Sequence, residues 1–69
     1  MREIDARGLS CPEPVLLVQN ALKQDDTGAA ISVDNMACVE NIRRFAEARG
    51  YAITVEEAGR EYRLRLTKP

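Results

Sequence analysis

Two stretches of the chain repeat apolar residues at the spacing of a helix. In residues 12–24 the repeat falls at i, i+3, i+4, i+7 and i+8, on Pro14, Leu17, Val18, Ala21 and Leu22. A second repeat starts around Asn35 to Cys38, and it comprises Cys38, Ile42, Phe45, Ala46 and Arg49, followed by Gly50. Such stripes are typical of helices packed on one side, and a glycine often ends a helix. The pattern therefore predicts two amphipathic helices.

Four other stretches alternate apolar and polar residues, as half-buried strands do. They cover residues 3–6, 29–34, 51–56 and 61–67. The alternation turns Ala29, Ile31 and Val33 inward in the second of them, and Tyr62, Leu64 and Leu66 inward in the last. The turn-like run 57–60 separates the last two stretches, which predicts a terminal hairpin.

The element order is strand, helix, strand, helix, strand, strand. A right-handed strand-helix-strand crossover puts its helix on one face of the sheet, and the second helix packs most simply on that same face. We therefore expect an α+β fold, a two-layer sandwich with a mixed four-stranded sheet, formed by residues 1–69 as a single domain. The open face of the sheet is predicted to carry Arg63 and Arg65, with Glu3, Asp5, Ser32 and Thr54.

Charge and hydropathy narrow the classes of function. The 69 residues include ten Lys and Arg against eleven Asp and Glu, a net charge of −1, with no long basic tract. Direct nucleic-acid binding is therefore not expected. Apolar runs such as Val15–Val18 fall far short of the roughly 20 residues that span a bilayer, and Met1–Asp5 lacks a signal-peptide core. We expect a cytoplasmic protein, monomeric on its own and without a membrane association.

Candidate chemistry is concentrated in the two cysteines, Cys11 and Cys38, because the chain has no histidine. Without an export signal the thiols are expected to be reduced, since cytosolic reductants keep structural disulfides rare. Two thiols cannot complete a four-ligand zinc site, and a Cys-His dyad is excluded. We predict no metal site and no cofactor.

Cys11 precedes a predicted helix. If Pro12 is the first helical residue, Cys11 is the cap, where the helix dipole favours an anion such as a thiolate. Pro12 and Pro14 fit a first turn but remove two N–H donors, Arg7 adds positive charge, and Glu13 suits the helix dipole. An inert, buried cap cysteine explains these residues equally well.

The segment Asp5-Ala6-Arg7-Gly8-Leu9-Ser10-Cys11-Pro12-Glu13-Pro14 resembles the N-terminal signature of the TusA/SirA/YedF family of small sulfur carriers. The resemblance continues through Val33-Asp34-Asn35, the second helix and Gly50-Tyr51, where it is greatest to the YedF branch. It implies a βαβαββ sandwich in which Cys11 is the working residue. Arg7, Gly8, Pro12, Glu13 and Pro14 are then the supporting residues of the Cys-Pro-x-Pro motif.

The resemblance also implies partners. Cys11 would accept a persulfide sulfur from a donor protein, such as a cysteine desulfurase or a rhodanese-like protein, and relay it to an acceptor protein. Such relays serve tRNA thiolation, cofactor synthesis or sulfur oxidation, and YedF-like members are associated with selenium. The chain would act as a sulfurtransferase-like carrier rather than as a self-sufficient enzyme.

Cys38 lies outside the family motif, and its role stays open between a core residue and a resolving thiol. Both strand-to-helix turns are predicted at one end of a parallel pair, so the two cysteines should be near neighbours. Helix starts roughly 10 Å apart exceed the Cα separation of about 7 Å that a disulfide tolerates, so bridging is not expected without movement. Two alternatives to a carrier remain: a noncatalytic interaction or regulatory domain, and a thiol-disulfide redox protein using both cysteines.

Overall fold

The structure is a computed structural model that describes residues 2–69. Six elements follow one another in the predicted order. Their bounds are β1 Arg2–Asp5, α1 Glu13–Gln24, β2 Gly28–Val33, α2 Met36–Ala48, β3 Ala52–Ala58 and β4 Glu61–Thr67.

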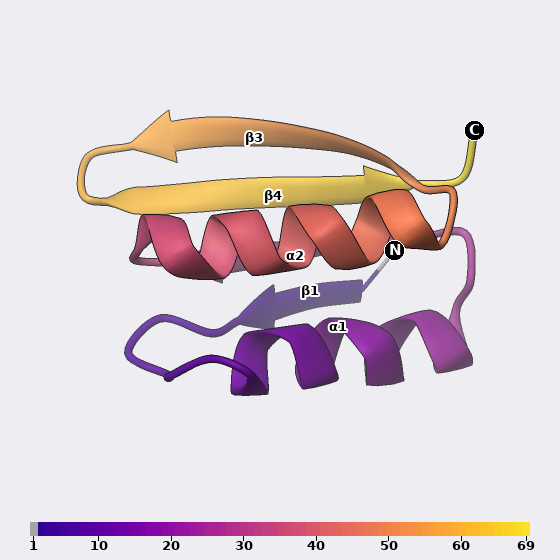
Figure 1. Cartoon of the computed structure of the whole chain (residues 1–69), viewed down its shortest axis with the longest axis horizontal. Coiled ribbons are helices and arrows are strands. Elements are labelled where there is room, and N and C mark those ends of the chain that lie inside the picture. Colours follow the sequence, from indigo (N-terminus) through magenta and orange to yellow (C-terminus); the bar gives the residue numbers. More distant parts are fainter. Residues whose placement is uncertain (1) are drawn as a thin grey trace.

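The four strands form one mixed sheet in the order β1-β2-β4-β3, and the neighbouring β4 and β3 are seen side by side in Figure 1. β1 and β2 are parallel, and their register pairs Ile4 with Ile31. β4 lies antiparallel between β2 and β3, and it pairs Leu64 with Ile31 on one side and with Val55 on the other. The parallel pair places the ends of β1 and β2, and hence the loops that lead into both helices, at one edge of the sheet.

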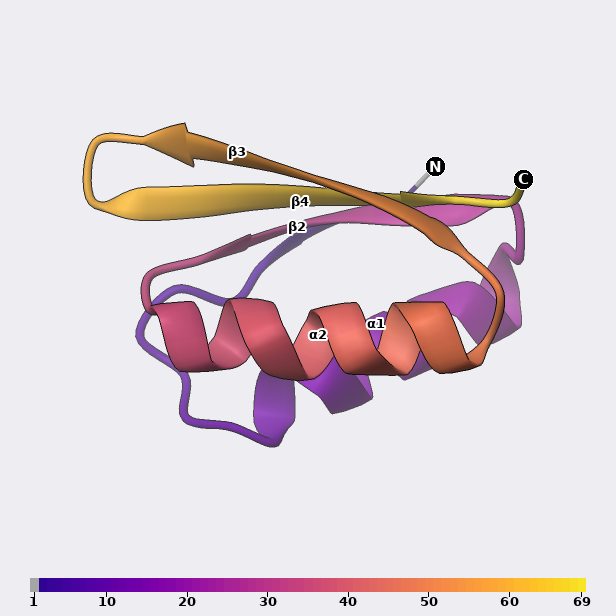
Figure 2. The same cartoon turned by 45° about the horizontal axis from the view of Figure 1, so that its top comes forward.

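Both helices cover the same face of the sheet, so the molecule has two layers (Figure 2). The residues buried between the layers come from both helices and the two central strands, and they include Val18, Ile42, Ile31, Leu64 and Leu66, each at most 1% exposed. The predicted α+β sandwich is confirmed, as is the inward alternation of β2.

Several element boundaries differ from the predicted ones by one or two residues. β3 continues to Ala58, which pairs with Glu61, so the hairpin turn is only Gly59 and Arg60 instead of the four residues expected. Gly59 has a φ of +65°, and a two-residue hairpin turn favours such left-handed backbone. The strand pairing therefore overrode the turn signal of Glu57 and Ala58.

The helical stripes are also narrower than their spacing predicted. Leu17 was expected to face the core but is 37% exposed, because it lies at the edge of the α1 stripe. Phe45 is only partly buried, and the Arg49 guanidinium stacks 4.8 Å from its ring centroid. Val39, which the spacing did not single out, is fully buried.

Candidate functional site

Cys11 lies in the loop between β1 and α1, where its side chain is partly buried against the core. The helix begins at Glu13 with Pro12 as its cap, so Cys11 is one residue outside the cap position predicted for it. Pro12 and Pro14 carry no N–H, and the Glu13 N–H donates to the Ser10 carbonyl at 2.9 Å. None of these three residues can donate a backbone hydrogen bond to an anionic sulfur.

Cys38 lies in the first turn of α2 and is 1% exposed. Asn35 caps this helix, and its side-chain Oδ1 accepts a hydrogen bond of 2.9 Å from the Cys38 N–H. An asparagine cap of this kind satisfies one of the N–H groups that the first turn leaves unpaired. The cap therefore fixes the backbone of Cys38 at the edge where α2 begins.

The two thiols touch. Cys11 Sγ lies 2.7 Å from Cys38 Sγ, although 27 positions separate the residues in the sequence. Both cysteines are free, and the separation exceeds the S–S bond length of about 2.05 Å. The expected proximity of the two cysteines is confirmed, and no disulfide joins them, although their sulfur atoms lie closer together than the spacing of the helix starts suggested. Cys11 precedes its helix instead of lying on it, so its side chain reaches across the gap between the helices.

Burial acts on the ionisation of Cys38. Loss of hydration raises the pKa of the Cys38 thiol above its usual value of 9.0, and the contact with Cys11 raises it further, while the hydrogen bond from the Asn35 cap opposes the shift. The Cys38 thiol is therefore protonated at neutral pH. Cys11, the more exposed of the two, is the thiol that an external reactant meets first.

The loop that carries Cys11 is tied to the end of β2. Gly8, at a φ of +80°, donates its N–H to the Asp34 carboxylate at 2.7 Å. Asp34 immediately precedes Asn35, so two consecutive residues hold the backbones of both cysteine-bearing segments. The sequence reasoning assigned Asp34 no part in the site. The sequence signal that could have indicated this role is the Asp34-Asn35 pair at the end of a strand, since the side chains of such residues commonly accept hydrogen bonds from backbone N–H groups.

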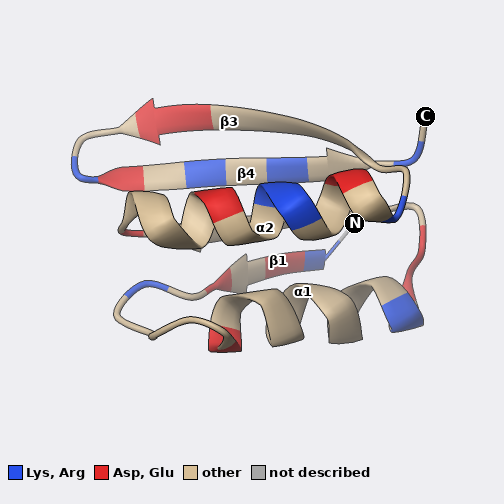
Figure 3. Cartoon of the chain, in the orientation of Figure 1, with Lys and Arg blue, Asp and Glu red and all other residues tan. Residues whose placement is uncertain are grey.

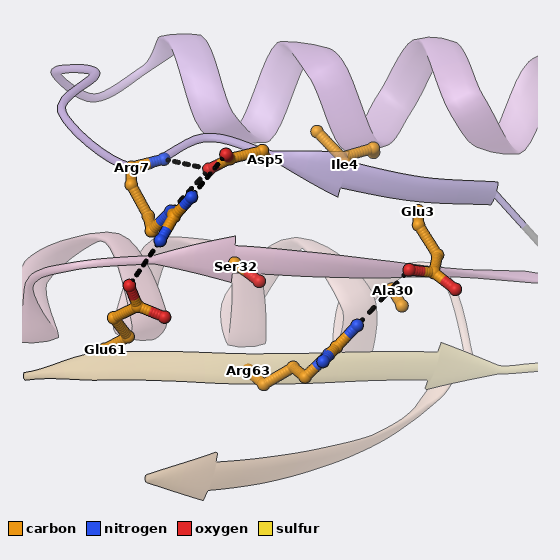
Figure 4. Close-up of a pocket in the computed structure, with 8 residues that line it drawn as sticks. All are labelled: Glu3, Ile4, Asp5, Arg7, Ala30, Ser32, Glu61 and Arg63. Atoms are coloured by element: carbon orange, nitrogen blue, oxygen red, sulfur yellow. Dashed lines mark hydrogen bonds and ion pairs between the residues drawn. The ribbon is translucent and has the colours of Figure 1, made fainter. Parts of the chain in front are cut away.

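Arg7 was expected to place positive charge near the Cys11 thiol, but its guanidinium is bonded to two carboxylates instead. Its guanidinium donates to Asp5 and Glu61 on the open face of the sheet (Figure 4). These bonds lower the pKa of Asp5 from 3.8 to about 2 and raise the pKa of Arg7. Arg7 therefore anchors the start of the loop, while the exposed Glu13 makes no side-chain bond within the described residues.

The open face is charged and shallowly hollowed. Glu3, Ser32 and Arg63 line the hollow shown in Figure 4, and Arg63 pairs with Glu3 at 3.3 Å. Arg63 and Arg65 give β4 two basic bands that follow the acidic Glu61 at its start (Figure 3). This surface holds no cysteine, so it is distinct from the thiol pair.

Other kinds of site lack support in the described chain. Within residues 2–69 no three His, Cys, Asp or Glu side chains lie close enough together to hold a metal ion. None of the helices in this part of the chain has the length and apolar character needed to cross a membrane. The contacting cysteines are thus the principal chemical feature.

Comparisons with known proteins identify the family of the chain. The family model described as sulfurtransferase TusA matches residues 2–68. A candidate sulfur carrier protein of Methanocaldococcus jannaschii is 37% identical over 71 aligned positions, which cover 99% of this chain and 95% of that one. The crystal structure of a SirA-like protein from Desulfitobacterium hafniense superposes with a TM-score of 0.88 at 30% identity, covering 97% of this chain and 96% of the other. The chain therefore belongs to the TusA family of sulfur carriers.

Proposed function

We propose that the protein carries sulfur as a persulfide on Cys11. The observation that carries this proposal is the unequal exposure of the two thiols: Cys11 is partly accessible at the edge where the helices begin, whereas Cys38 is 1% exposed. Membership of the family implies a protein that donates the sulfur and another that accepts it. A cysteine desulfurase or a rhodanese-like protein is the donor we propose.

The loading step is a thiol exchange. The Cys11 thiolate attacks the outer sulfur of the donor persulfide, a new bond forms between Cys11 Sγ and that sulfur, and the donor cysteine leaves as a thiolate. No electron source is required, because a sulfane sulfur moves between two thiolates. Delivery repeats the step with an acceptor thiolate as the nucleophile. The absence of histidine suits this chemistry, which needs no imidazole base.

The surroundings of Cys11 favour docking of a partner protein. Leu16, in the first turn of α1, is 51% exposed, and Met36, the first residue of α2, is 47% exposed. Both side chains belong to helix starts next to the thiols, since Cys38 lies in the first turn of α2 and Cys11 lies in the loop that leads into α1. Apolar side chains exposed near a reactive group are a common feature of interaction sites. We propose that the donor and the acceptor contact this edge.

Mass spectrometry of the intact protein tests the proposal. After incubation with a cysteine desulfurase and cysteine, the wild-type chain and Cys38→Ala should each gain a sulfur atom, an increase of about 32 Da. Cys11→Ser should gain none. Loading of Cys11→Ser, or no loading of folded Cys38→Ala, would contradict the assignment of Cys11. A noncatalytic interaction domain predicts no loading of any variant and full activity of Cys11→Ser in cells.

Selenium is a finer question within the same proposal. The resemblance to the YedF branch implies selenium transfer, and a selenium atom on Cys11 would be held by the same exchange chemistry. The test repeats the loading experiment with a selenocysteine lyase and selenocysteine in place of the cysteine desulfurase and cysteine, and compares the extent of loading in the two reactions. Loading with selenium in preference to sulfur would support the YedF-like role.

A further inference from the structure

We propose that Cys38 is a resolving thiol that discharges the Cys11 persulfide as hydrogen sulfide and leaves a Cys11–Cys38 disulfide. This inference rests on the proposed loading of Cys11. It assigns to the second cysteine a reaction that simple relay of sulfur does not require.

The first argument is distance. The two Sγ atoms lie 2.7 Å apart, closer than two unbonded sulfur atoms ordinarily approach, and only a short movement separates this contact from a disulfide. Cys38 is held in this place by the cap hydrogen bond from its N–H to Asn35. Cys11 is held by its partly buried position against the core.

The second argument is direction. Cys38 is 1% exposed, and its Sγ touches the Sγ of the partly accessible Cys11, so the accessible part of the Cys11 sulfur is the part that Cys38 does not cover. A sulfur added to Cys11 therefore extends away from Cys38, toward the solvent side from which a donor delivers it. Displacement at sulfur takes place in line, with the nucleophile opposite the leaving group. Cys38 is thus placed to attack Cys11 Sγ itself, with the outer sulfur as the leaving group.

The step balances without an external oxidant. A bond forms between Cys38 Sγ and Cys11 Sγ, and the bond between Cys11 Sγ and the outer sulfur breaks. The outer sulfur takes the bonding electron pair and leaves as sulfide, together with the proton of the Cys38 thiol. The sulfane sulfur is reduced as Cys38 is oxidised. A second round requires a dithiol reductant, such as a thioredoxin-type protein, to reopen the disulfide.

The fate of the carried sulfur depends on which of the two sulfur atoms of the Cys11 persulfide is attacked. An acceptor thiolate attacks the outer sulfur and receives it as a persulfide, whereas Cys38 attacks the inner sulfur and releases sulfide. The burial of the Cys38 thiol slows its own attack and leaves time for an acceptor to dock. The chain is thereby equipped to deliver persulfide when a partner is bound and free sulfide when none is.

A single-turnover experiment tests the inference. Wild-type protein and Cys38→Ala are loaded with a cysteine desulfurase and cysteine, freed of small molecules, and followed without reductant by intact mass and by trapping of sulfide with monobromobimane. The wild-type chain should lose its added sulfur, become about 2 Da lighter than the reduced protein, and release one sulfide per disulfide formed. Cys38→Ala should keep its sulfur at least about tenfold longer.

Controls separate this reaction from others. The wild-type rate should not change on dilution, because the attack is intramolecular. Cys38→Ser, which keeps the size of the side chain, should behave as Cys38→Ala does, and circular dichroism should show that both variants are folded. Peptide mapping should find the disulfide between Cys11 and Cys38.

Each contrary outcome has a distinct meaning. Equal retention of sulfur by the wild-type chain and Cys38→Ala would overturn the resolving role and leave the proposed carrier function intact. Sulfur mapped on Cys38 would also overturn it, because attack would then have occurred at the outer sulfur. Failure of folded Cys38→Ala to load would defeat the carrier proposal, and the resolving role with it.

Discussion

Asp34 accepts the backbone N–H of Gly8 at 2.7 Å, and this bond joins the loop of Cys11 to the residue that precedes the Asn35 cap. The carboxylate thus acts as a positioning group for a thiol pair that it does not touch. Two segments separated by 26 positions are held together by one charge-assisted hydrogen bond.

Removing the bond between Gly8 and Asp34 should affect the relative position of the two thiols while lowering the stability of the fold only slightly. We expect Asp34→Ala to lower the free energy of unfolding by about 1 kcal/mol, because the bond is exposed to water. It should also slow the formation of the Cys11–Cys38 disulfide in a glutathione redox buffer. Asp34→Asn keeps an acceptor oxygen and is the matched control. A rate of disulfide formation unchanged in Asp34→Ala would show that Asp34 does not position the thiols.

The cap of α2 provides a second prediction. Asn35→Ala removes the acceptor of the Cys38 N–H and should cost about 1 kcal/mol of the free energy of unfolding, as loss of an N-cap usually does. Asn35→Ser retains a cap oxygen and should recover most of that loss. Urea denaturation followed by circular dichroism measures both. Equal stability of the Ala and Ser variants would argue against a capping role.

The ion pairs of Arg7 predict how the stability of the fold changes at acidic pH. Hydrogen bonds from Arg7 lower the pKa of Asp5 from 3.8 to about 2. A carboxyl group whose pKa is lower in the folded chain stabilises the fold above its unfolded pKa, and this stabilisation is lost as the pH falls toward the folded value. The stability advantage of the wild-type chain over Asp5→Asn should therefore shrink between pH 4 and pH 2.

The measurement is urea unfolding of both chains across that range of pH. Glu57→Gln is the control, because within residues 2–69 the Glu57 carboxylate forms no ion pair. Its difference from the wild-type chain should vary little over the same range. High salt should reduce the Asp5 effect, since the pair is exposed and is screened.

Leu17 and Val18, neighbours in α1, test whether the observed burial or the helical spacing better predicts the cost of a substitution. The helical spacing placed both Leu17 and Val18 inward, but Val18 is fully buried and Leu17 is 37% exposed. Val18→Ala should therefore cost about 2 kcal/mol of the free energy of unfolding, and Leu17→Ala less than about 1 kcal/mol, although the leucine loses more atoms. Chemical denaturation compares them directly. A larger cost for Leu17→Ala would contradict the observed packing.

Local patterns predicted most of the fold because they reflect local physics. Period-two alternation identified the bounds of β4 at 61–67, and its inward Leu64 and Leu66 are buried, Tyr62 is partly buried, and both arginines are exposed. The helix of 12–24 was placed to within one residue, because its prolines fit a first turn. The hairpin turn was predicted too long, since the pairing of Ala58 with Glu61 depends on a partner strand that the local signal does not contain.

The candidate site was predictable in kind but not in geometry. The motif identified Cys11, and the parallel strand pair predicted that Cys38 would be near it. The contact between the sulfurs was missed, because a distance between helix axes does not describe a side chain from the preceding loop. The pairing of Arg7 with Glu61 was likewise missed. It joins residues 54 positions apart, which no local periodicity relates.

The unequal burial of the thiols leads to a last prediction, on their order of alkylation. Iodoacetamide reacts with thiolates that it can reach, and Cys38 is 1% exposed with a pKa raised by burial and by the contact with Cys11. At neutral pH the reduced chain should be modified first at Cys11, as peptide mapping would show. Raising the pH should increase the rate at which Cys38 is modified, because a larger fraction of its thiol is then ionised. Cys11→Ser isolates the slow thiol and Cys38→Ala the fast one. If Cys38 reacted as fast in folded Cys11→Ser at neutral pH as Cys11 does in Cys38→Ala, the α2 start would have to open readily, and burial could not delay the attack of Cys38 on a Cys11 persulfide.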